Sequence, residues 1–112
     1  MQNLDHKKKE AFARKMGTIL NSGALNLAMG IGYRLGLFEA MDELGQPAGA
    51  EDIAARASLN ERYVREWLGV MACGEVVEIT ADQDGRELFV LPREHADVIT
   101  TRAGSANMGV YT

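Results

Sequence analysis

The residues most suggestive of chemistry are three glycines in the run 30–36, Gly-Ile-Gly-Tyr-Arg-Leu-Gly. A glycine-rich loop binds a nucleotide phosphate when it follows a strand and opens a helix whose N-terminus faces the phosphate. Here the glycines follow a long helical pattern, and the last interval is one residue longer than in the dinucleotide-binding motif. We therefore interpret Gly30, Gly32 and Gly36 as sites of a bend or of close helix packing.

Metal binding and nucleophilic catalysis need groups that this sequence does not cluster. The single cysteine, Cys73, and the two histidines, His6 and His95, are far apart in the sequence. We predict no catalytic residue, no metal site and no cofactor site in this chain, which by itself is not expected to be an enzyme. Cys73 is interpreted as a half-buried small hydrophobe, and the absence of a possible intrachain disulfide favours a cytoplasmic protein.

Composition places the chain among single-domain globular proteins. It has 112 residues, 46% of them hydrophobic, and a net charge of −4. The uncharged stretch 16–33 contains Thr18, Asn21, Ser22, Asn26 and four glycines, so its transfer into lipid is unfavourable and no membrane partner is expected.

The first predicted element is a helix from Asp5, its N-cap, to Gly30 or slightly beyond. A main apolar stripe recurs at helical spacing, and further apolar or small residues lie off it, so we expect the second half of the helix to be buried all round. The main stripe contains Phe12, Met16, Ile19, Gly23, Leu27 and Ile31, and the off-stripe positions include Leu20, Ala24, Leu25, Ala28 and Met29.

Three shorter helices and a hairpin are predicted to follow. The helices are expected over 37–44, 50–57 and from about 61 to Gly74, and either Asn60 or Ser58 could cap the last of them. Strands are expected over 76–80 and 87–91, joined by a turn containing Asp84-Gly85. One or two helical turns are expected over 94–100.

This order predicts a mainly α fold, a winged helix-turn-helix with a long N-terminal helix and a C-terminal two-stranded β-hairpin wing. We expect a winged-helix dimerisation domain over 1–100, divided into a helical arm, 1–47, and the helix-turn-helix with its wing, 48–91. Residues 101–112 are expected to be a linker.

The helix beginning near residue 61 occupies the position that reads DNA in helix-turn-helix proteins. Its outward residues are expected to be Glu61, Arg62, Arg65, Glu66, Gly69 and Cys73. Arginines and glutamates on that face can form i,i+4 pairs, and the wing tip is net acidic, so we expect no nucleic-acid partner. Tyr63 and Trp67 are interpreted as core residues.

Four segments resemble one known family. They are GYRLGLFEA at 32–40, EDIAAR at 51–56 and NERYVREWL at 60–68, with LPREHA at 91–96 after the wing. The chain closely resembles the N-terminal winged-helix domain of class I S-adenosylmethionine-dependent methyltransferases. Its nearest kin resemble bacterial small-molecule methyltransferases, and the O-methyltransferases with an N-terminal dimerisation domain are more distant. The resemblance covers about residues 10–112 but does not identify a substrate.

The resemblance implies a non-catalytic dimerisation and substrate-lid domain of a methyltransferase acting on a small molecule. The chain would then be the front portion of a longer enzyme or a free-standing relic of one, and its uncapped tail favours a truncated fragment. In the longer enzyme, S-adenosylmethionine would be bound by a C-terminal Rossmann-like domain absent from this sequence. It further implies that Tyr33, Arg34, Asn107 and Tyr111 could line a substrate cavity, although packing roles would explain them too. The alternative is a winged-helix transcriptional regulator that binds DNA or senses a ligand.

A homodimer through the first helix is expected as well. The remaining helices are short and can cover only one side of its apolar half. We expect Leu20, Leu25, Ala28 and Met29 to be left without a partner inside the chain and to form the dimer interface. Gly23, Gly30 and Gly32 would let a partner helix approach closely.

Overall fold

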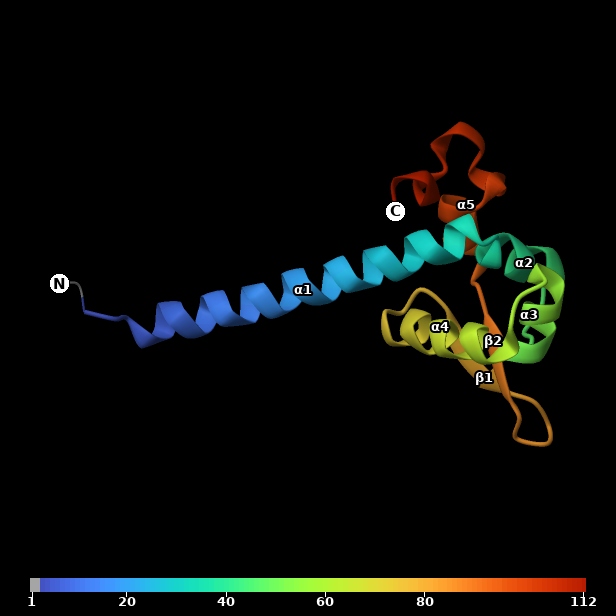
Figure 1. Ribbon diagram of the computed structural model, residues 1–112, viewed down its shortest axis with the longest axis horizontal. Helices are drawn as coiled ribbons and strands as arrows, with labels where there is room; N and C mark the ends of the chain where they lie inside the picture. The colour runs from blue at the N-terminus through green and yellow to red at the C-terminus, as the bar shows by residue number, and fades with distance from the viewer. Residues whose placement is uncertain (1–2) are drawn as a thin grey trace.

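A computed structural model describes residues 3–112 (Figure 1). Its elements are α1 (His6–Arg34), α2 (Leu37–Leu44), α3 (Ala50–Ala57), α4 (Glu61–Cys73), β1 (Glu78–Ala81), β2 (Glu87–Val90), α5 (Arg93–Ile99) and the 3₁₀ helices η1 (Thr101–Ala106) and η2 (Met108–Tyr111). The helix-turn-helix followed by a two-stranded antiparallel wing is the predicted winged-helix fold.

Helix α1 is a single rod of 29 residues. The Asp5 carboxylate caps its start by accepting hydrogen bonds from the backbone N–H groups of Lys7 and Lys8, at 3.0 and 3.2 Å. The N-terminal half projects away from all other elements in Figure 1, and the molecule is therefore elongated, with extents of 60 × 38 × 24 Å. Gly30 and Gly32 lie inside the rod, and the bend comes at Gly36, whose φ of 76° suits glycine.

The caps of the short helices explain where they begin and end. Asn60, not Ser58, caps α4, because the Asn60 side chain accepts a hydrogen bond from the Tyr63 N–H at 3.2 Å. Ser58 instead ends α3 in the left-handed conformation, with φ at 58°. The two residues therefore divide the turn between them, one closing a helix and the other opening the next.

The core lies where α2, α3 and α4 meet the C-terminal half of α1 and the wing. Trp67 packs edge-on against Phe38, with ring centroids 5.1 Å apart, and its indole N–H donates to the Ala28 carbonyl of α1 at 2.9 Å. A Cβ added to Gly32 would lie 2.1 Å from the Trp67 ring. The close-packing interpretation of the glycine run is thus confirmed at Gly32. Trp67 is a core residue as predicted, whereas the same prediction for Tyr63 is wrong, because Tyr63 is 42% exposed.

The wing begins two residues later than predicted. Glu75 adopts a positive φ of 61°, and the N–H groups of Val76 and Val77 both donate to the Met71 carbonyl, so these valines still belong to the turn after α4. The strands pair from Glu78 opposite Val90 to Ala81 opposite Glu87. Phe89 also exchanges two backbone hydrogen bonds with Ala48, which fastens the wing to the segment before α3.

The C-terminal segment folds back onto the domain. Helix α5 and η2 contact each other, η1 contacts α5, and η2 lies against the end of α1. Residues 101–112 are therefore two consecutive 3₁₀ helices rather than an extended strand of chain. Their expected role as a linker to a further domain stays a prediction.

Candidate functional site

The apolar residues of α1 face in two opposite directions. Leu25, Ala28 and Met29 are partly buried and pack against the core, so the expectation that these three lack a partner inside the chain is wrong. The stripe on the other side of the helix is the exposed one, with Phe12 at 61%, Leu27 at 68% and Ile31 at 38% exposed. The expectation that the second half of α1 is buried all round is therefore wrong too.

The position of Trp67 explains this orientation. Only the face of α1 that carries the Gly32 Cα and the Ala28 carbonyl can receive the indole of α4, and Leu25 and Met29 lie on that same face. The stripe on the opposite face is consequently turned outward. We name it the α1 stripe, and it consists of Phe12, Met16, Ile19, Leu20, Gly23, Leu27 and Ile31.

Glycines of α1 differ in whether the chain already uses the space beside them. Gly32 is filled by Trp67, and Gly30 is covered by the backbone of Thr112 and the Arg34 guanidinium. A Cβ on Gly23 would meet nothing within 4 Å. Of the three glycines expected to admit a partner helix, only Gly23 is open.

The expected cavity-lining residues lie at the junction of α1 with η2. Tyr33 is half-buried against Gly109, where a Cβ would come within 2.9 Å of the Tyr33 ring. Asn107 is buried, and its side-chain oxygen caps η2 by accepting from the Gly109 N–H at 2.8 Å. Arg34 is exposed and donates to the Thr112 carbonyl at 3.4 Å, whereas Tyr111 is 82% exposed.

Three of these four residues therefore have packing or capping roles inside the chain. Tyr33 supports η2, Asn107 begins it and Arg34 holds its end. Tyr111 alone directs most of its side chain to solvent. That this junction lines a substrate cavity stays a prediction.

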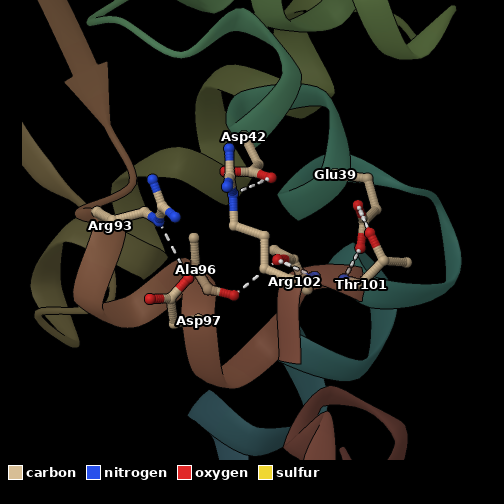
Figure 2. Close-up of polar contacts among 8 residues, drawn as sticks. Glu39, Asp42, Arg93, Ala96, Asp97, Thr101 and Arg102 are labelled. Atoms are coloured by element: carbon tan, nitrogen blue, oxygen red, sulfur yellow. Dashed lines mark hydrogen bonds and ion pairs between the residues drawn. The ribbon is translucent and has the colours of Figure 1, made fainter. Parts of the chain in front are cut away.

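A polar clamp between α2 and η1 was missed by the sequence analysis (Figure 2). The Arg102 guanidinium donates to both oxygens of Asp42, at 2.6 and 2.8 Å. Thr101 donates its N–H and hydroxyl to the Glu39 carboxylate, at 2.7 and 3.0 Å. The hydrogen bond to Asp42, together with its charge, raises the pKa of Arg102. The clamp fixes the direction in which the chain leaves α5.

The outward face of α4 is neutralised as predicted. Arg62 pairs with Glu66 at 3.8 Å and Arg65 with Glu61 at 3.4 Å, and all four side chains are largely exposed. At the wing tip, Asp82 accepts hydrogen bonds from the N–H groups of Asp84 and Arg86, at 2.9 and 2.8 Å. Neither element presents an uncompensated cluster of cations to a phosphate backbone.

Other candidate sites are modest within residues 3–112. An apolar pocket of about 260 Å³ is bordered by Met29, Val76, Val98 and the His95 ring. Nδ1 of His95 forms a hydrogen bond with the Val76 carbonyl at 2.7 Å. Cys73 is exposed rather than half-buried. In this part of the chain no group of three metal-ligating side chains comes together, and no helix has the length and hydropathy needed to cross a membrane.

Comparison with known proteins gives a matching family and a set of structural neighbours, among them the following two. The model of the Rv2258c-like winged HTH domain matches residues 23–102. Human N-acetylserotonin methyltransferase in complex with SAM superposes on 80% of this chain with a TM-score of 0.69 and 16% identity. PigF with SAH superposes on 97% of it with a TM-score of 0.62 and 22% identity.

The two neighbours are much longer proteins. The chain spans 26% of the length of the first and 28% of the second. At these identities the likeness establishes the fold. No curated protein matches the sequence.

Proposed function

Since the chain belongs to the family of Rv2258c-like winged HTH domains, we propose that it is a non-catalytic domain of an S-adenosylmethionine-dependent methyltransferase that acts on a small molecule. One structural neighbour was solved in complex with SAM, the methyl donor, and the other with SAH, its demethylated product. This chain corresponds to about a quarter of the length of each. The rest of such an enzyme would be a Rossmann-like domain that binds S-adenosylmethionine. The charge-paired face of α4 argues against the alternative of a DNA-binding regulator.

The first role of the domain is to form a homodimer through α1, and the exposed α1 stripe is the observation that carries this proposal. Ile19, Leu20 and Leu27 are 50%, 65% and 68% exposed and lie on one side of a helix that the chain itself leaves open. Apolar surface in water costs roughly 25 cal/mol per Å², and contiguous apolar patches usually mark interfaces. Leu20 belongs to this stripe, whereas Leu25, Ala28 and Met29 stabilise the domain that presents it.

The second role is that of a lid over the catalytic domain. At the junction of α1 with η2, Tyr111 is exposed, Asn107 is buried, and Arg34 donates a hydrogen bond to the carbonyl of Thr112. The clamp from Arg102 to Asp42 ties η1, the segment just before η2, to α2. A lid that excludes water and positions the methyl acceptor needs such a fixed edge.

Light scattering on the 112-residue chain tests the first role. We expect a dimer at tens of micromolar and a monomer when Ile19 and Leu27 are both changed to Asp, because two carboxylates would have to be buried in the interface. Asn21→Asp is the matched control, since Asn21 is an exposed residue on another face of α1. Circular dichroism should show that each variant keeps its fold. A monodisperse wild-type monomer refutes the proposed dimer.

Titration calorimetry tests whether S-adenosylmethionine binding belongs to another domain. The chain should release no measurable heat with S-adenosylmethionine, because none of its described residues forms a strand–glycine loop–helix unit that could hold the cofactor. Micromolar affinity for the 112-residue chain would contradict the proposal that the cofactor belongs to another domain.

A further inference from the structure

The charge of this protein is divided between two regions. Residues 1–20 contain five basic and two acidic residues, and residues 21–112 contain seven basic and fourteen acidic ones. The projecting half of α1 therefore carries a net charge of +3, while the remainder carries −7. Between Lys15 and Arg34, α1 has no charged side chain at all.

We propose that the α1 helices of two copies pair antiparallel through the α1 stripe, with the basic half of each helix lying along the uncharged half of the other. The inference rests on the proposed homodimer and adds its orientation. It follows from two separate features of the stripe, the distribution of charge along α1 and the distribution of side-chain size within the stripe.

Charge disfavours the parallel arrangement. Two parallel helices would place two basic segments, each with a net charge of +3, side by side, with Lys9 nearest the contact, and would bring the two acidic bodies to the same end. Like charges at such short distances are destabilising. In the antiparallel pair residues 10–22 of each helix meet residues 21–33 of the partner, which are uncharged, and only Lys9 lies opposite a cation, the partner's Arg34, before the helix ends beside the partner's acidic body.

Side-chain size favours the same orientation. Suppose that the two-fold axis runs between the two helices at the level of residues 21 and 22. Phe12 then lies opposite Ile31, Met16 opposite Leu27, and Leu20 opposite Gly23. Leu20 is 65% exposed and Gly23 has nothing within 4 Å, so each leucine enters the space above the partner's glycine, twice per dimer. A parallel pair in register would set glycine against glycine and leave a gap there.

Position-specific crosslinking tests the orientation. In a Cys73→Ser background, Phe12→Cys and Ile31→Cys chains are prepared separately and oxidised alone and as a mixture. In the antiparallel dimer the two copies of residue 12 are about 28 Å apart along the helix axis, at ~1.5 Å per residue, too far for a disulfide. Each variant alone should stay uncrosslinked, and the mixture should yield a disulfide-linked dimer.

The outcomes separate this inference from the proposed function. Crosslinking of Phe12→Cys alone would mean parallel helices and would overturn the inference while keeping the dimer. A dimer by light scattering with no crosslink in the mixture would place the contact elsewhere and would overturn it as well. Absence of any dimer would refute both the proposed assembly and its orientation. Both substituted residues are exposed, so the fold of each variant should be retained, which circular dichroism checks.

Discussion

Replacing Gly32 by alanine probes the contact that orients the whole domain. The new methyl group would lie 2.1 Å from Cζ2 of Trp67, and the ring cannot move away freely because its N–H is bonded to the Ala28 carbonyl at 2.9 Å. Overpacking of this kind typically costs about 1–3 kcal/mol. Alanine regains up to ~1 kcal/mol over glycine within a helix, so the net loss should be about 1–2 kcal/mol.

Urea unfolding followed by the fluorescence of Trp67, the only tryptophan, measures this loss. Gly69→Ala is the matched control, because Gly69 lies inside α4 and a Cβ there would meet nothing within 4 Å. We expect the control to be more stable than the wild type by up to about 1 kcal/mol. The two glycine-to-alanine changes should therefore have opposite signs.

A Trp67→Phe background adds a sharper check. If the clash with the indole is the cause, Gly32→Ala should cost less when the smaller ring is present, which gives a coupling energy between the two positions. A Gly32→Ala variant as stable as the wild type would refute the close approach of α1 and α4. Equal costs in both backgrounds would refute the assignment of the clash to Trp67.

Three further predictions concern the cap, the clamp and the face of α4. Asn60→Ala should destabilise the chain by about 0.5–2 kcal/mol in urea unfolding, since the Tyr63 N–H loses its partner, whereas Ser58→Gly should not destabilise, because residue 58 has a positive φ. Arg102→Ala should speed amide exchange in residues 101–112 with little change in global stability. Arg93→Ala, which breaks only the local pair with Asp97, is the control and should leave that exchange unchanged. Equal exchange rates in the two variants would refute the clamp. A gel shift with duplex DNA at low salt should show weak binding at best, and tight, sequence-selective retardation would support the regulator instead.

Local signals accounted for most of the secondary structure. Asp5 and Asn60 indicated where two helices begin, and the Asp84-Gly85 pair indicated the hairpin. The short helices begin and end close to the predicted residues. The strand was placed too early because Val76 and Val77 have strand-forming side chains. Their backbone, however, is held in the turn by the Met71 carbonyl, which no pattern of side chains reveals.

The two faces of α1 could not be assigned from the sequence. The helix is apolar on nearly every side, so periodicity shows two candidate faces and does not rank them. The choice depends on Gly32 and Trp67, which are 35 residues apart in the sequence. The clamp was missed for the same reason, because Arg102 and Asp42 are separated by 60 residues and neither stands in a local motif.

If the proposed dimer forms, the projecting half of α1 also makes the amount of helix in this protein depend on its concentration. Residues 6–20 have no tertiary support in the described chain, and isolated helices of about 12–15 residues are only marginally stable in water. In a dilute solution of separate chains we expect this half to fray, and in the proposed dimer the partner would hold it. Association is then also a folding step, with a larger negative heat capacity change than the docking of two preformed helices would give.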